Sequence, residues 1–191
     1  MNSLPNKSCR KSNRLNGYEY TLAGAYFVTI VTYQYLCMFG EVINGEMKLN
    51  PSGKIAFDQW MRLSKRFSLS DFSTFVIMPN HVHGILFMKG AGDDTRNNHD
   101  QSSTLRPFSS FHIVPGSLGA IVRAYKASVS FRINIMLNLD HPPIWQRNYY
   151  DHIIRDQNDF DNIWKYIEQN PIKWDEDRFS PKTILNINNF L

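Results

Sequence analysis

The segment 72–88 constrains the fold most, because it holds two strand-like runs separated by a break. Phe72–Met78 and His81–Met88 are rich in the β-branched and aromatic residues that favour strands. Pro79 has no backbone N–H to donate to a strand ladder, so the break falls at Pro79-Asn80. Two strands joined by so short a connection can pair only in antiparallel fashion. We therefore expect an antiparallel sheet.

Other runs of strand character lie before and after this pair. Two have the composition of full strands, and a third reads as a small hairpin that turns at Asn44-Gly45, a pair that accepts positive φ. These strands are predicted at Gly24–Tyr35 and Ile144–Ile154, and the hairpin at Glu41–Leu49.

Three segments instead repeat their apolar residues at three- and four-residue steps, the spacing of an amphipathic helix. The last of them has Asp156 or Asn158 as a possible N-cap and ends before Pro171. The helices are predicted at Ser52–Phe67, Ser117–Asn138 and Asn158–Asn170. Strands alternating with helices around a hairpin-like middle indicate an α+β fold, an antiparallel sheet with helices packed on one face.

Length and composition bound the class of protein. With 191 residues, 42% of them apolar, the chain can form one domain with a substantial core. No run approaches the roughly 18 apolar residues of a membrane helix, and the N-terminus lacks the apolar centre of a signal peptide, so we expect a cytoplasmic protein. Cys9 and Cys37 form no CxxC motif and are expected to be free thiols. The predicted organisation is a basic arm (1–16), a main domain (17–175) with a flexible insertion (89–114), and a tail (176–191).

The net charge is modest, 21 − 17 = +4, but it is unevenly distributed. Residues 1–14 and 101–139 contain basic residues and no acid, and such segments attract phosphate backbones. A solubilising tail and an ordinary helix surface would have the same composition. The candidate phosphate contacts are Lys7, Arg10, Lys11, Arg14, Arg123 and Lys126.

His81-Val82-His83 is the first motif that carries chemistry. Residues i and i+2 of a strand point to one face, so the two imidazoles project side by side. Two histidines with one oxygen ligand leave positions open for substrate oxygens, which suits Mg²⁺ or Mn²⁺ better than a closed zinc site. Taken alone, the pair could equally be incidental, with one ring in solvent and the other hydrogen-bonded.

Two tyrosines are candidates for a nucleophile. Tyr125 lies in a basic helix but on its apolar stripe, so its ring is expected in the core. Tyr166 falls roughly 110° from the centre of its helix's apolar stripe, with Asn170 one turn further on. A phenol beside an amide oxygen suits a metal-assisted nucleophile, although a surface tyrosine near a helix-ending Asn-Pro would give the same pattern. Tyr149 and Tyr150 should point to opposite faces of a strand, one to the core and one to a possible base-stacking surface.

Together these residues resemble a known family, the REP-associated tyrosine transposases. This family is a branch of the single-tyrosine transposases, within the nucleases that carry a histidine–hydrophobic–histidine motif. The matching blocks are MPNHVHGILF (78–87), IWQRNYYDHIIRD (144–156) and YIEQNPIKW (166–174), and the resemblance also extends over 17–33 and 39–55. The specific element is the histidine pair followed, in this order, by Y-I-x-x-N-P.

The resemblance implies a ferredoxin-like, RRM-like fold and metal-dependent cutting of single-stranded DNA near hairpins. Matched residue by residue, His81 and His83 bind the divalent metal and Asn170 is the third ligand. Tyr166 would become linked to a 5′-phosphate and leave a free 3′-OH, while the basic arm grips the hairpin. A family member would act on the bacterial nucleoid. Monomer and homodimer both stay open, as does the group that deprotonates Tyr166.

Two other functions are compatible with the sequence. One is a non-catalytic protein that binds DNA hairpins on the same fold. The other is an unrelated metal-binding or structural α+β domain. Formation of a metal-dependent covalent DNA adduct separates the nuclease from both.

Overall fold

The computed structural model describes residues 23–67, 74–88, 116–138 and 143–181. The basic arm with Lys7, Arg10, Lys11 and Arg14 lies outside the described residues, as does the predicted insertion 89–114. None of the helices in the described ranges is long and apolar enough to cross a membrane.

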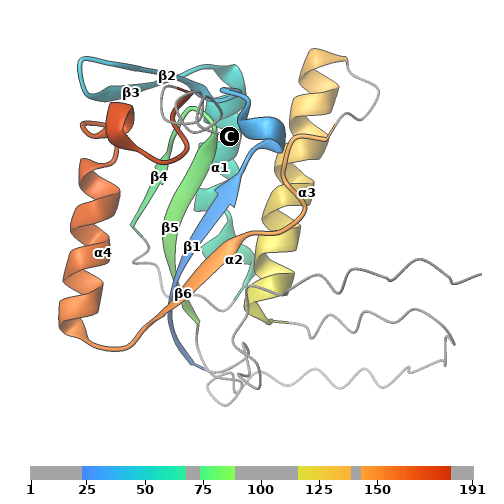
Figure 1. Ribbon diagram of the computed structural model, residues 1–191. Helices are drawn as coiled ribbons and strands as arrows, with labels where there is room; N and C mark the ends of the chain where they lie inside the picture. The colour runs from blue at the N-terminus through green and yellow to red at the C-terminus, as the bar shows by residue number, and fades with distance from the viewer. Residues whose placement is uncertain (1–22, 68–73, 89–115, 139–142, 182–191) are drawn as a thin grey trace, which may run out of the picture.

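Four antiparallel strands form the central sheet, in the order β4-β5-β1-β6 (Figure 1). The strands are β1 (Gly24–Val31), β4 (Phe75–Ile77), β5 (His81–Met88) and β6 (Tyr150–Ile154). With one helical segment between β1 and β4 and another between β5 and β6, the chain runs β-α-β-β-α-β, the ferredoxin-like arrangement. The antiparallel α+β class expected from the sequence is confirmed.

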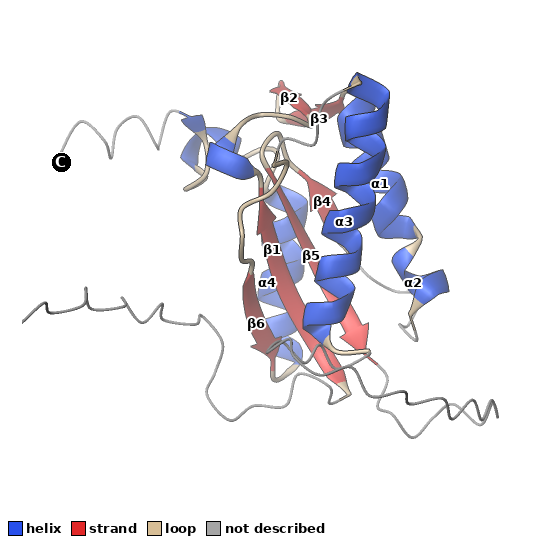
Figure 2. Cartoon of the chain, turned by 90° about the vertical axis from the view of Figure 1, so that its right-hand side faces the viewer, coloured by secondary structure: helices blue, strands red, loops and turns tan. Residues whose placement is uncertain are grey.

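Helices cover both faces of this sheet. Figure 2 shows α1 and α3 on one side of the strands and α4 on the other. The sequence predicted helices on one face, whereas α4 packs on the other; this matters because α4 carries the candidate nucleophile. The helices are α1 (Pro51–Met61), α2 (Leu63–Arg66), α3 (Leu118–Leu137) and α4 (Gln157–Gln169), with short 3₁₀ turns η1 (Tyr33–Tyr35) and η2 (Trp174–Glu176).

Local sequence accounts for most element boundaries. The hairpin of β2 (Gly40–Ile43) and β3 (Glu46–Leu49) turns at Asn44 (φ 53°) and Gly45 (φ 76°), as predicted. Asp156 is the N-cap of α4, and its carboxylate accepts from the Asp159 amide at 2.9 Å. The strand predicted over 144–154 is shorter than expected: β6 begins only at Tyr150, and Trp145 makes an isolated bridge to Thr32.

The apolar core lies under α1 and α3. Tyr26, Val28 and Ile30 of β1 are fully buried there, because alternate residues of a strand share one face. Gly84 of β5 leaves room for Trp60: a Cβ at this position would lie 2.2 Å from the Trp60 ring. The intervening residues of β1 and β5 face α4, and this is where the polar cluster lies.

Candidate active site

The candidate site lies between the sheet and α4. Phe27 and His83 are on the α4 face of their strands, and both rings contact Tyr166, at centroid distances of 6.1 and 5.1 Å. On the same face, near the N-terminus of α4, the Phe87 ring packs against that of Phe160, with 5.9 Å between the ring centroids. Apolar contacts therefore hold α4 on the sheet, with the histidines and Tyr166 side by side at its C-terminal end.

The orientation of the His81 ring is fixed by Asn80. The Asn80 Nδ2 donates to two carbonyls, that of Tyr35 at 3.1 Å and that of Phe179 at 2.7 Å, which determines how the amide is turned. Its Oδ1 must then accept the proton of His81 Nδ1, 2.9 Å away. The lone pair of a neutral His81 is left on Nε2, the atom that a metal would use.

His83 is held in a comparable way. Its Nδ1 is 2.8 Å from Thr29 Oγ1, and its Nε2 is 3.2 Å from the Tyr166 hydroxyl. The two imidazoles lie with centroids 4.4 Å apart, so His81 and His83 share one strand face as predicted. Tyr166 is 42% exposed and reachable by a substrate from solvent.

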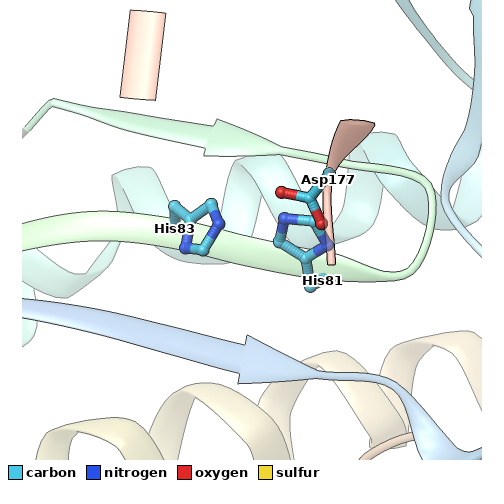
Figure 3. Close-up of side chains that lie close together, drawn as sticks. All are labelled: His81, His83 and Asp177. Atoms are coloured by element: carbon cyan, nitrogen blue, oxygen red, sulfur yellow. The ribbon is translucent and has the colours of Figure 1, made fainter. Parts of the chain in front are cut away.

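Asp177 completes the cluster from the segment that follows α4 (Figure 3). Its Oδ1 accepts from the Phe179 amide at 2.7 Å. Its Oδ2 accepts from Asn170 Nδ2 at 3.2 Å and from the Tyr166 hydroxyl at 3.4 Å. One carboxylate thus links the candidate nucleophile to the candidate amide ligand.

This donor set fits a divalent cation. One ligand atom from each of His81, His83 and Asp177 lies within 4.8 Å of the others, and all three residues are buried. His81 Nε2 and Asn170 Oδ1 are buried and have no hydrogen-bond partner among the described residues. Buried polar atoms are rarely left unpaired, and a cation is one partner that both acceptors can share. A His-His-Asp group, with an amide oxygen beside it, could therefore bind a metal.

Burial keeps both histidines neutral, as metal ligands must be. It lowers the pKa of His81 to about 4, against smaller upward contributions from Asp177 and Asn170. It also lowers the pKa of His83, with the charges of His81 and Arg178 acting in the same direction. Burial and then the Asp177 charge raise the pKa of Tyr166 to about 12, so the phenol needs help to lose its proton.

The competing tyrosine lies on the other face of the sheet. Tyr125 is fully buried, and its hydroxyl donates to the Ala56 carbonyl at 3.1 Å. Burial raises the pKa of Tyr125 well above its usual range. It is a core residue, as its place on the apolar stripe of α3 predicted.

Comparison with known proteins gives one clear relative. An uncharacterized protein of Haemophilus influenzae is 37% identical over 170 residues, covering 88% of this chain and 92% of that protein. The chain belongs to the family of this protein. No protein-family model matches the sequence.

A transposase of known structure has the same fold as this chain. A REP-associated tyrosine transposase bound to a REP hairpin superposes with a TM-score of 0.54 and 16% identity, over 84% of this chain and 74% of that one. The match confirms the fold that the sequence resemblance implied. A putative transposase from Deinococcus radiodurans gives a TM-score of 0.42 at 15% identity, over 81% of this chain and 95% of that one.

Arg123 and Lys126, predicted as phosphate contacts, lie on α3, across the sheet from this site. The Lys126 ammonium donates to the carbonyls of Gln146 and Asn148, the latter at 3.2 Å. Burial lowers the pKa of Lys126 to about 8. The ammonium of Lys126 therefore anchors the loop before β6, while Arg123 is exposed, and phosphate contact by either residue stays a prediction.

Several site residues were not anticipated from the sequence. Asp177 was assigned to the tail, one acid among three in Asp175-Glu176-Asp177, with no local signal to separate it from its neighbours. Thr29 and Asn80 were read only as parts of a strand and a turn. Asp177 follows Asn170, the C-cap of α4, by seven residues, a spacing that is compatible with a return to the helix end but does not require it.

Proposed function

We propose that this chain is a metal-dependent single-strand DNA endonuclease and strand transferase of the REP-associated tyrosine transposase type, acting at DNA hairpins. The observation that carries the proposal is the Tyr166 hydroxyl, which belongs to a 42% exposed side chain and lies 3.2 Å from Nε2 of the buried His83. The shared fold supports it, since the transposase of that fold was solved with a hairpin. Such a protein would work in the bacterial cytoplasm, on nucleoid DNA.

His81, His83 and Asn170 are the proposed ligands of Mg²⁺ or Mn²⁺, and Asp177 joins them in the same cluster. Amide and carboxylate oxygens beside two imidazoles suit these ions. When bound, the cation would polarise the scissile phosphate and neutralise charge on its oxygens. Asn80 holds His81 in the tautomer that ligation needs, and Thr29 orients the His83 ring.

The covalent step uses Tyr166. Its hydroxyl oxygen forms a bond to the scissile phosphorus, and the bond from phosphorus to the 3′-oxygen breaks. The phenolic proton passes to Asp177 Oδ2, 3.4 Å away, while the departing oxygen takes a proton from solvent and becomes a 3′-OH. The phosphodiester bond energy is kept in the 5′-phosphotyrosine, so another 3′-OH can attack it and join strands without ATP.

The DNA backbone is expected to be held by cations away from the reacting phosphate. The basic arm, with Lys7, Arg10, Lys11 and Arg14, is the main candidate, together with the exposed Arg123. We leave Lys126 out of this set, because its ammonium already donates to backbone carbonyls. The proposal holds for a monomer and for a homodimer alike.

The test is covalent capture of DNA. Labelled single-stranded hairpins from the flanking genomic DNA are incubated with the protein and Mg²⁺ or Mn²⁺, then run on a denaturing gel. We expect a slow, protein-linked band that EDTA abolishes. Binding without any such band would favour the non-catalytic hairpin-binding protein, and failure to bind at low salt would leave only an unrelated α+β domain.

A further inference from the structure

Arg178 lies beside the proposed active site in a constrained position. Its guanidinium carbon is 5.0 Å from the centre of the Tyr150 ring and 4.4 Å from that of the Phe179 ring. Tyr150 belongs to β6, where it is paired with Thr29, the residue that bonds His83. The arginine is therefore held against two rings at the edge of the metal-ligand cluster.

The backbone on both sides of Arg178 is anchored. Asp177 bonds Asn170 and the Phe179 amide, and the Phe179 carbonyl accepts from Asn80. Asp177 and Phe179 are 8% and 4% exposed, whereas Arg178 between them is exposed. An exposed cation on so fixed a backbone loses little entropy when it binds a ligand.

The hydrogen-bonding edge of Arg178 is available. The ring contacts do not use its N–H groups as hydrogen-bond donors, and these groups match phosphate oxygens in geometry. The ion pairs found among the described residues join Lys48 to Glu46 and His152 to Asp159, so neither occupies Arg178. Its charge acts on the reacting groups: it lowers the pKa of Tyr166 and of both site histidines.

We propose that Arg178 is a catalytic residue whose guanidinium edge binds the scissile phosphate that Tyr166 attacks. This inference rests on the proposed function. The arginine would donate to non-bridging phosphate oxygens and stabilise the charge that develops there as the phosphorus–oxygen bond forms. Contact with the Tyr150 and Phe179 rings holds the guanidinium in place.

Arg178→Gln tests the assignment, with Arg66→Gln as the matched control. Arg66 is also exposed and also lies over a ring, that of Phe67 at 5.6 Å, but it is on α2, on the far side of the sheet. Two quantities are measured on a labelled single-stranded hairpin: the salt dependence of binding without metal, and the single-turnover rate of adduct formation with Mn²⁺. Melting temperatures confirm that each variant is folded.

For Arg178→Gln we expect the slope of log K against log salt to fall by about 0.7, the value for one lost contact to single-stranded DNA. We also expect the adduct rate to fall by about 10²-fold, the scale of one lost transition-state donor. Arg178→Lys should restore the slope but only part of the rate, because an ammonium lacks the planar fork. Arg66→Gln should change neither quantity.

Two results would overturn the inference. An unchanged salt slope in Arg178→Gln would show that the arginine does not contact DNA. A reduced slope with a normal adduct rate would place its phosphate away from the reaction. If wild type forms no adduct at all, the proposed function fails, while the salt slope still decides whether Arg178 contacts DNA.

Discussion

The two faces of the sheet are built from alternating residues of the same strands, yet they bury different kinds of side chain. On the α1 and α3 face the core side chains of β1 are apolar or aromatic, and the Tyr125 hydroxyl has a backbone partner. On the α4 face the same strands bury His81 and His83, and two acceptor atoms stay unpaired among the described residues. Trp60 Nε1 and Asn134 Oδ1 are also buried without a partner on the α1 and α3 side, so unpaired atoms alone do not separate the two faces. The difference is that the one group of potential metal ligands found among the described residues lies on the α4 face, which makes that face the candidate binding site.

Tyr125 and Tyr166, one on each face, differ in how exposed they are. Tyr125 is enclosed, and nothing in solvent can reach its hydroxyl. Tyr166 is 42% exposed, and its hydroxyl lies near an imidazole and a carboxylate. Position relative to the sheet, rather than residue type or nearby basic charge, separates a core phenol from a candidate nucleophile.

The largest expected effect is that of His81→Ala, which should reduce adduct formation to background because a cation would lose a ligand that Asn80 holds in place. Binding to the hairpin should persist, since it depends on distributed phosphate contacts. The measurements are the adduct on a denaturing gel and the rise in melting temperature on adding Mn²⁺. His152→Ala is the matched control, an exposed histidine on the same side of the sheet that pairs with Asp159. An Mn²⁺-dependent melting shift that survives His81→Ala would contradict the metal site.

The α4 face should also make stability pH-dependent. The pKa of His81 is about 4 in the folded protein and about 6.5 when unfolded, so the unfolded chain binds more protons between these values. The free energy of unfolding should then fall as pH drops from about 6.5 to 4, by about 2–3 kcal/mol for this group. Urea titrations of the metal-free protein measure it, and His81→Gln should make the profile less steep, leaving the contribution of His83, whose pKa burial also lowers. A profile of the same steepness in the variant would assign the loss to other groups.

On the core face, Gly84→Ala should destabilise the protein by about 1–3 kcal/mol, because the added methyl group overlaps the Trp60 ring. Gly24→Ala is the control in the same sheet, since its Cβ would meet Tyr26 only at an ordinary 3.6 Å. Urea midpoints compare the two variants. Equal stability would mean that Trp60 moves aside at little cost, and that this face is less tightly packed than described.

The smallest effect expected is that of Lys126→Met, which removes hydrogen bonds to the loop before β6 and should cost about 1–2 kcal/mol of stability. The salt dependence of DNA binding should not change. Arg123→Gln, one turn earlier on the same helix, should do the opposite, lowering the salt slope without loss of stability. A reduced slope in Lys126→Met would return this lysine to the DNA-binding set.

What could be predicted from the sequence was local in origin. The histidine pair follows from strand alternation, and the polar position of Tyr166 from helical spacing. The hairpin turn and the Asp156 cap of α4 have short sequence signals, and they formed as expected.

What could not be predicted depends on contacts between distant segments. Thr29 bonds His83 across 54 positions, and Asn80 bonds Phe179 across 99. Asp177 reaches Asn170 only because the chain turns back after α4. The strand over 144–154 was predicted too long, since the Lys126 ammonium and the Trp145 indole, which donates to the Lys126 carbonyl, hold its first half as a loop.

The most direct test of the account is to locate the DNA in the trapped adduct and compare Tyr166→Phe with Tyr125→Phe. Tyr166→Phe should fold normally, bind hairpin DNA and Mn²⁺, and form no covalent adduct, because only the accessible hydroxyl is lost. Tyr125→Phe should form the adduct at close to the wild-type rate, and peptide mapping should place the DNA on Tyr166. An adduct that survives Tyr166→Phe and disappears in Tyr125→Phe would contradict the account and reverse the roles assigned to the two faces of the sheet.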